Sequence, residues 1–227
     1  MKKIAVYVEG GGGSSSQQGE LRQGFDQLFR SQKLAASANG VSLRFVCCGS
    51  RNDTHIKFIG IRRLAEPGAW YGLLVDAEDE IGPESPKPKD ETPEAATLRK
   101  LADARKRKDH LVRRDGWPLQ EVPPDCIHLM VRCMEAWIVA DPEALEEYYS
   151  KGFKTKKLPA SNNLENEPKV QVYAKLENAT KDTTKGAYEK IKHASKLLGF
   201  IDPIKISARC PRFASFAGWL EEQISNA

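Results

Sequence analysis

Apolar and polar positions over the first third of the chain predict three strands separated by two helices. Residues 3–8 form a nearly continuous β-type run, which is typical of a strand buried on both faces, and residues 41–48 and the apolar residues 70–75 predict two further strands. Apolar side chains recur at helical spacing over residues 20–36, and Asp53 is a candidate N-cap for a helix through Leu64. Alternating strands and helices of this kind predict a parallel sheet.

Beyond Asp76 the pattern becomes mainly helical. A Pro- and charge-rich stretch, residues 82–93, predicts a loop, and Thr92-Pro93 has the hydroxyl N-cap and first-turn proline that begin a helix. After a connector, residues 127–131 predict a fourth strand that runs into a helix through Ala140. Four further helices are expected over residues 142–149, 168–179, 184–198 and 213–224.

These elements predict a Rossmann-like α/β fold with a mainly parallel sheet of about four strands and a helical C-terminal part. We expect residues 1–141 to form the α/β core, with a basic helical insertion at about 82–118, and residues 142–227 to pack on it as a helical accessory region. Apolar residues make up 40% of the 227, enough for a core. No apolar run is long enough for a signal peptide or a membrane span, which favours a cytoplasmic protein with no membrane partner.

Acidic residues follow two of the predicted strands. Glu9 ends the first strand, and Asp76, Glu78 and Asp79 follow the third. Parallel strands bring their carboxyl ends to one edge of the sheet, where α/β proteins place their sites. In extended geometry Asp76 and Glu78 point the same way and can share one ion, while Asp79 points elsewhere or serves as an outer acid.

Such an edge predicts a metal centre of Glu9, Asp76, Glu78 and Asp79 that binds Mg²⁺, with Mn²⁺ as an alternative. Glu9 is either a further ligand or a general acid/base. The number of acids suits one metal ion or two. A turn or helix cap would explain Asp76 alone, but two acidic strand ends on one edge favour function.

The glycines that follow Glu9 favour the approach of a phosphate to the backbone. Gly10, Gly11 and Gly12 precede a predicted helix, whose first N–H groups attract anions. The run lacks the lysine and hydroxyl residues of a nucleotide-binding P-loop, so alone it is weak evidence.

Glu135 is a further candidate catalytic residue because it lies in the apolar run of residues 127–140. A carboxylate among such neighbours needs a partner or a metal. Arg132, three residues earlier, could pair with it on a helix, and this explanation and a role beside the metal are equally plausible.

Two basic stretches suit a polyanionic partner such as DNA or RNA. The first covers residues 99–114 and includes Arg105 and Lys106; the second covers residues 181–212. In the second, Lys185 and Lys192 are candidate phosphate-binding residues, and Lys190 and His193 are candidates to contact a scissile phosphate or leaving group. A solvated helix face explains either stretch more simply.

Several of these motifs resemble the bacterial domain-of-unknown-function family four-two-seven-six. They are the strand ends Val-Glu-Gly-Gly (8–11) and Val-Asp-Ala-Glu (75–78), the segment His-Leu-Met-Val-Arg-Cys-Met-Glu-Ala-Trp-Ile-Val-Ala-Asp (128–141) and the block at 185–193. That family is similar to Toprim proteins, including nucleases that accompany ABC-type ATPases in phage defence. The resemblance implies a Toprim-like fold and Toprim chemistry for Glu9, Asp76 and Glu78, with an ABC-type ATPase as a partner. Glu78 stands where the Toprim pattern has aspartate.

The leading hypothesis from the sequence is a metal-dependent nuclease that acts on DNA or RNA. A non-catalytic module that docks on an ATPase is the alternative from another class. A phosphotransferase or nucleotide-binding enzyme is a third, and the chain is too short for a strand-passing topoisomerase.

Overall fold

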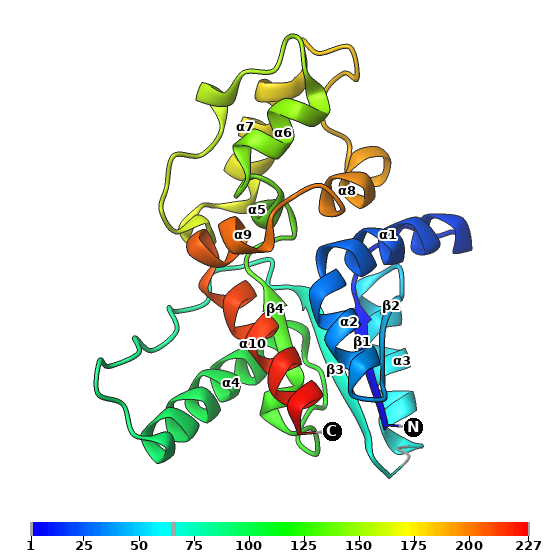
Figure 1. Ribbon diagram of the computed structural model, residues 1–227, viewed down its shortest axis with the longest axis vertical. Coiled ribbons are helices and arrows are strands. Elements are labelled where there is room, and N and C mark those ends of the chain that lie inside the picture. Colours follow the sequence, from blue (N-terminus) through cyan, green and yellow to red (C-terminus); the bar gives the residue numbers. More distant parts are fainter. Residues whose placement is uncertain (1, 65–66, 227) are drawn as a thin grey trace.

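A four-stranded parallel sheet forms the centre of the computed structural model, which describes residues 2–64 and 67–226 (Figure 1). The strands are β1 (Lys2–Val8), β2 (Val41–Cys47), β3 (Ala69–Asp76) and β4 (Ile127–Met130). They lie in the order β2-β1-β3-β4, and each neighbouring pair is parallel. The α/β fold predicted from the alternation of strands and helices is confirmed, and so is the number of strands among the described residues.

Helices cover both faces of this sheet. One face packs against α1 (Ser15–Leu28), α2 (Arg30–Ala38) and α10 (Pro211–Ser225), and the other against α3 (Arg51–Arg63) and α4 (Pro93–Asp115). Successive strand residues enter opposite cores: Val6 lies in the first cluster and Ala5 in the second. Strand β3 is buried on both faces and is a nearly continuous apolar run, whereas the edge strand β2 alternates buried residues with more exposed ones such as Arg44.

Two predicted helix starts differ from the structure. The helix expected over residues 20–36 begins earlier, at Ser15, where Ser14 and Gln17 form a capping box, and it divides at Phe29. Phe29 has the non-helical cap conformation there, and its ring packs on Phe45. The N-cap of α3 is Ser50, whose Oγ accepts the Asp53 N–H at 3.2 Å, so Asp53 is a first-turn residue.

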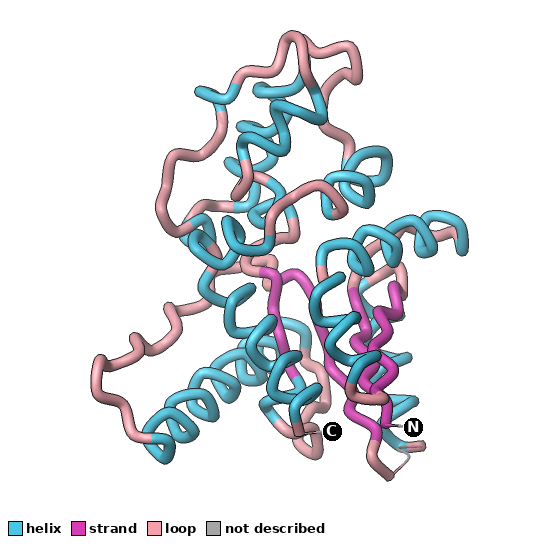
Figure 2. Tube along the Cα trace, in the orientation of Figure 1, coloured by secondary structure: helices cyan, strands magenta, loops and turns pink. Residues whose placement is uncertain are grey.

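The C-terminal part is helical, as predicted (Figure 2). Its helices are α5 (Glu135–Ile138), α6 (Pro142–Tyr149), α7 (Lys169–Thr180), α8 (Lys190–Leu198) and α9 (Pro203–Arg209), with 3₁₀ turns at Pro124–Cys126, Thr155–Lys157 and Leu164–Asn166. The helix expected over residues 184–198 begins only at Lys190, because Gly186 has a positive φ of 78° that an α-helix excludes. Lys185 therefore lies outside α8, and Ile191, the second residue of the helix, is 48% exposed.

The two halves of the chain are packed together, and α8 lies against α1. Gly24 permits this approach, since a Cβ there would lie 2.3 Å from the carbonyl oxygen of Ser195. The division into a core and an accessory region stays a prediction. Within the described residues, the helices lack the combination of length and apolar character that crossing a bilayer requires.

Candidate metal centre

Three of the four predicted acids converge at the carboxyl edge of the sheet. Glu9 follows β1 and Asp76 ends β3, its neighbour in the sheet, while Glu78 lies two residues further on. One carboxylate oxygen of each lies within 4.8 Å of the other two. In the sheet order β2-β1-β3-β4 the chain first moves outward from β1 to β2 and then crosses back over β1 to β3. Ligands of such sheets bind at the switch point between β1 and β3.

Glu78 reaches the centre by a different route from the one predicted. The strand ends at Asp76, and Glu78 has a left-handed φ of 66°, so the expectation of an extended backbone there is wrong. The N–H of Glu78 donates to the carbonyl of Arg132 at 2.9 Å and that of Ala77 to the carbonyl of Met130 at 2.8 Å, which holds the turn. A non-glycine residue in this region is strained, and such strain concentrates at functional sites.

Asp76 is the most enclosed of the three acids, with 2% of its surface exposed. Its Oδ1 accepts the backbone N–H of Met134 at 2.9 Å. Its Oδ2 lies 3.3 Å from the ammonium of Lys190 and 3.9 Å from that of Lys169. Burial raises the pKa of Asp76, and the Lys190 ammonium opposes that rise.

Glu9 links the two strand ends. Its Oε2 accepts the backbone N–H of Asp76 at 3.1 Å and a guanidinium N–H of Arg51 at 2.9 Å. Burial, and then the neighbouring Asp76 carboxylate, raise the pKa of Glu9 to about 7, although Arg51 and Lys190 lower it. This carboxyl therefore takes up and releases a proton near neutral pH when no metal is bound.

Arg51 was missed by the sequence reasoning. It is the first residue of α3, and its guanidinium pairs with Asp115 at 2.7 Å while also contacting Glu9 and the carbonyl of Asp76. Its guanidinium also lies 5.1 Å from the Trp117 ring centroid. The strand-end rule that found Glu9 also points to the turn after β2, where Arg51 lies, so a signal existed.

Lys169 was also missed. It is the first residue of α7, and its Nζ lies 2.6 Å from Glu78 Oε2. No pattern near position 169 marks it, because the contact joins residues 91 positions apart in the chain. The sheet edge and the C-terminal helices therefore build the centre together.

Glu135 is fully buried and tied to the C-terminal helices. Its Oε1 accepts the hydroxyls of Tyr173 at 2.7 Å and Tyr188 at 2.9 Å, and lies 3.6 Å from the Lys190 ammonium. Its Oε2 has no hydrogen-bond partner among the described residues. The suggested partner Arg132 instead contacts Glu80 at 3.4 Å, so pairing with Arg132 does not explain this acid.

Three other predicted residues do not enter the cluster. Asp79 is exposed and pairs with Arg114 at 2.9 Å. The Nδ1 of buried His193 accepts the N–H of Glu189 at 3.0 Å, which satisfies the start of α8. Lys192 lies 3.5 Å from the exposed carboxylate of Glu189.

The remaining predicted phosphate-binding residues are the glycines of the turn after Glu9 and Lys185. Gly10, Gly11 and Gly12 all have positive φ values, of 122°, 87° and 64°, so the turn after Glu9 requires glycine. Gly10 exchanges two backbone hydrogen bonds with Gly49, which ties this turn to the end of β2. Lys185 lies 4.9 Å from the ring centroid of Tyr148.

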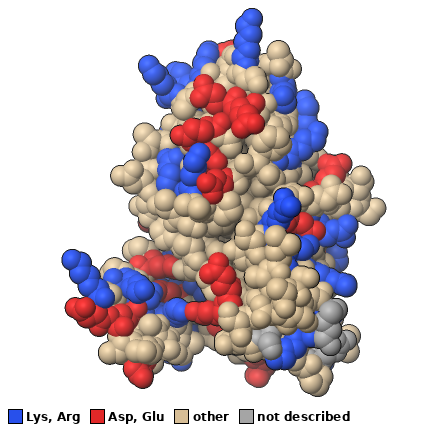
Figure 3. Space-filling view, viewed as in Figure 1, with Lys and Arg blue, Asp and Glu red and all other residues tan. Residues whose placement is uncertain are grey.

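The basic cluster of α4 is occupied mainly by contacts inside the protein. Of its eight basic residues, all but Arg105 contact acceptor groups in the described chain. Lys106, for example, lies 2.9 Å from Asp103. Arg105 is ten residues before Asp115, about 15 Å along the helix axis. Basic and acidic side chains also mingle over the face drawn in Figure 3, without one continuous basic surface.

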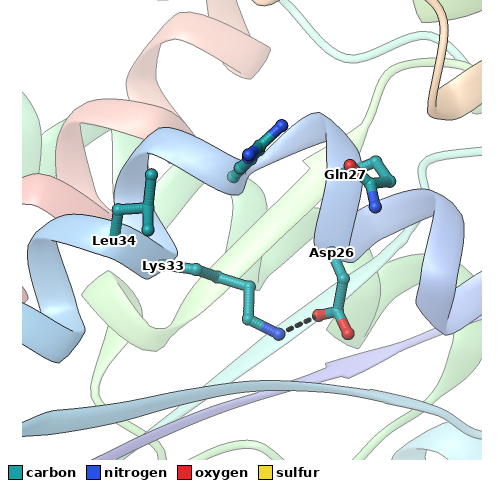
Figure 4. A pocket seen from close by; sticks show the side chains of 5 residues that line it. Asp26, Gln27, Lys33 and Leu34 are labelled. Atoms are coloured by element: carbon teal, nitrogen blue, oxygen red, sulfur yellow. Dashed lines mark hydrogen bonds and ion pairs between the residues drawn. The ribbon is translucent and has the colours of Figure 1, made fainter.

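A depression of about 390 Å³ lies at the corner between α1 and α2, formed by Asp26, Gln27, Arg30, Lys33 and Leu34 (Figure 4). Lys33 and Asp26 pair across it at 2.5 Å. Its lining contains none of the acids of the metal centre, so the depression is separate from it.

The donor set at the sheet edge suits a hard divalent cation. Glu9, Asp76 and Glu78 offer only carboxylate oxygens, the ligands that Mg²⁺ and Mn²⁺ prefer. Crowded carboxylates also repel each other, and a bound cation relieves this repulsion. Asp76 and Glu78 come from the end of β3, and Glu9 comes from the end of the adjacent strand β1.

The chain matches the family described as Domain of unknown function (DUF4276) over residues 8–221. No curated protein and no solved structure matches it. The matched span includes Glu9, Asp76, Glu78, Lys169 and Lys190, so every acid and lysine of the metal centre falls within it. The chain therefore belongs to the DUF4276 family.

Proposed function

We propose that this protein is a Mg²⁺-dependent phosphodiester hydrolase, a nuclease that acts on DNA or RNA, with Mn²⁺ as an alternative ion. The observation that carries the proposal is the convergence of Glu9, Asp76 and Glu78 within 4.8 Å at the switch point of a parallel sheet. Lysine ammoniums lie directly against these acids, so the centre combines ligands for a cation with groups that attract phosphate.

The proposed chemistry assigns each side chain a task. Asp76 and Glu78 hold the cation, which when bound neutralises the phosphate charge and activates water. Glu9 accepts a proton from the attacking water, a task that suits a carboxylate at the end of the strand beside Asp76. Lys190 and Lys169 contact the non-bridging oxygens of the phosphate from the side of the C-terminal helices.

Arg51 supports Glu9 in this scheme. Its guanidinium contacts both Asp115 and Glu9, so it fixes the direction of the Glu9 carboxylate. The relation to Toprim proteins, the phage-defence setting and an ABC-type ATPase partner belong to the same proposal. They rest on the resemblance of the motifs around Glu9, Asp76 and Glu135.

Calorimetry with Mg²⁺ and Mn²⁺, together with a cleavage assay on mixed DNA and RNA, tests the proposal. We expect Asp76→Asn to lose metal binding and to lower cleavage by on the order of a hundredfold or more. Glu9→Gln should likewise lose cleavage and keep its fold, as judged by circular dichroism.

Asp79→Asn is the matched control, since it removes the same charge from an exposed side chain that pairs with Arg114 outside the cluster. It should leave both metal binding and cleavage unchanged. Cleavage that persists in purified Asp76→Asn would refute the assignment. A wild type that binds no metal would favour the non-catalytic, ATPase-docking alternative.

A further inference from the structure

Two buried acids share a single ammonium at the centre. Lys190 Nζ lies 3.3 Å from Asp76 Oδ2 and 3.6 Å from Glu135 Oε1, and the side chains of these acids are 3% and 0% exposed. Buried carboxylates are costly unless a cation compensates them. Lys190 is therefore a counter-ion that Asp76 and Glu135 share. Lys169 is a second cation near Asp76, at 3.9 Å.

Both acids are fixed, whereas the lysine is not. Tyr173 and Tyr188 donate their hydroxyls to the same oxygen of Glu135, and the N–H of Met134 holds Oδ1 of Asp76. Lys190 begins α8 and bears its ammonium on four rotatable methylenes. Because the ammonium already lies within 3.6 Å of both acids, rotation within the side chain is sufficient to change its partner.

A divalent ion on Asp76 and Glu78 competes with this ammonium. Like charges a few ångströms apart repel each other in a partly buried site, and the repulsion is greater for a doubly charged ion. The ammonium cannot keep its contact with Asp76 once the metal ion binds there. Glu135 is the remaining acid within its reach, and Oε2 of Glu135 has no hydrogen-bond partner among the described residues.

We propose that Lys190 is a displaceable internal cation: a divalent ion that binds Asp76 replaces its ammonium there, and Glu135 retains the displaced ammonium inside the centre. Glu135 is thus a positioning residue, with Tyr173 and Tyr188 fixing its carboxylate. The inference rests on the proposed metal-dependent function and adds an order of events. Metal binding frees Lys190 from Asp76, and only then does its ammonium become available to a phosphate.

Mn²⁺ titration by calorimetry, without nucleic acid, tests the displacement. Lys190→Met keeps the length of the side chain and removes the competing charge, so we expect Mn²⁺ to bind about tenfold more tightly than to the wild type. Lys196→Met is the matched control, because it removes the same charge from an exposed position of the same helix. Its Mn²⁺ affinity should equal that of the wild type.

A double-mutant cycle tests the holding role of Glu135. Glu135→Gln should weaken Mn²⁺ binding more when Lys190 is present than in the Lys190→Met background, because the displaced ammonium then has no acid to receive it. An equal effect in both backgrounds would show that Glu135 acts only through its own charge. A larger effect in the Lys190→Met background would make it a metal ligand. Either result overturns the holding role, and Glu189→Gln, on an exposed acid, is the control.

Should Lys190→Met not fold without metal, Lys190→Gln replaces it, and the rise in Tm caused by Mn²⁺ should exceed that of the wild type. Unchanged or weaker Mn²⁺ binding in both Lys190 variants, with binding still lost in Asp76→Asn, overturns this inference alone. No Mn²⁺ binding by the wild type overturns it together with the proposed function.

Discussion

The basic residues of α4 and the two lysines of the metal centre, Lys169 and Lys190, have different surroundings. The run on α4 has eight basic residues, and all but Arg105 contact acceptors inside the described chain. Lys169 and Lys190 lie 21 positions apart in the sequence, yet the ammonium groups of both lie within 3.9 Å of the carboxylate of Asp76. The basic residues of α4 mainly stabilise the fold, whereas Lys169 and Lys190 contact the acids of the metal centre.

The comparison shows that the density of basic residues along a sequence does not predict which of them lie at the candidate site. On α4, Arg107 is buried and donates to the carbonyl of Ile127 at 2.7 Å and to Glu84 at 3.1 Å, so it anchors the loop of residues 82–92. Lys190 sits at a helix start that folding brings to the sheet edge. The role of each basic side chain therefore depends on the groups that it contacts in the folded protein.

The largest expected effect tests the structural half of this comparison. Arg107→Met leaves Glu84 and the Ile127 carbonyl without their buried partner, so the free energy of unfolding should fall by about 3 kcal/mol. Urea denaturation measures this change. Arg105→Met, two residues earlier and exposed, should change it by less than about 0.5 kcal/mol. Equal effects would remove the distinction between the two positions.

A smaller effect tests the chemical half. Lys169→Met removes the ammonium beside Glu78 and should lower kcat/KM for nucleic-acid cleavage about tenfold, with a shallower dependence on salt. Lys100→Met removes the same charge from α4, where it pairs with Glu222, and should lower kcat/KM less than twofold. A greater loss from the α4 variant would reverse the comparison and place the nucleic acid on α4.

The smallest expected effect concerns pH and the metal-free centre. The pKa of Glu9 is about 7 in the folded protein against 4.5 unfolded, so between these values only the folded chain keeps the proton. This contribution to stability is full below pH 4.5 and is lost as the pH rises through 7. In EDTA, thermal unfolding should show the wild type gaining about 1 kcal/mol, relative to Glu9→Gln, between about pH 7.5 and about pH 6.

Saturating Mg²⁺ should cancel this gain, because a bound cation keeps Glu9 ionised. The same pH dependence in Glu9→Gln would assign the proton to another group. Persistence of the gain in Mg²⁺ would show that the cation does not reach Glu9.

Local patterns were sufficient for the strands and for the acids that follow them. A strand buried on both faces must be apolar throughout, and parallel strands share one carboxyl edge, so the residue pattern alone places Glu9 and Asp76 together. The helix starts were less predictable. Ser14 and Ser50 are the N-caps, upstream of the predicted helix start at residue 20 and the predicted cap Asp53, because capping depends on the conformation of a single residue.

The sequence by itself thus determined the α/β class, the order of strands and helices, and the two acidic strand ends. Only the tertiary structure decided that Lys169, Lys190 and Arg51 neutralise those acids, that Glu135 binds Tyr173 and Tyr188, and that most of α4's basic side chains are engaged within the fold. The physical reason is range. Strand burial and the common edge follow from neighbours along the chain, whereas an ion pair depends on a distance in space that packing alone sets.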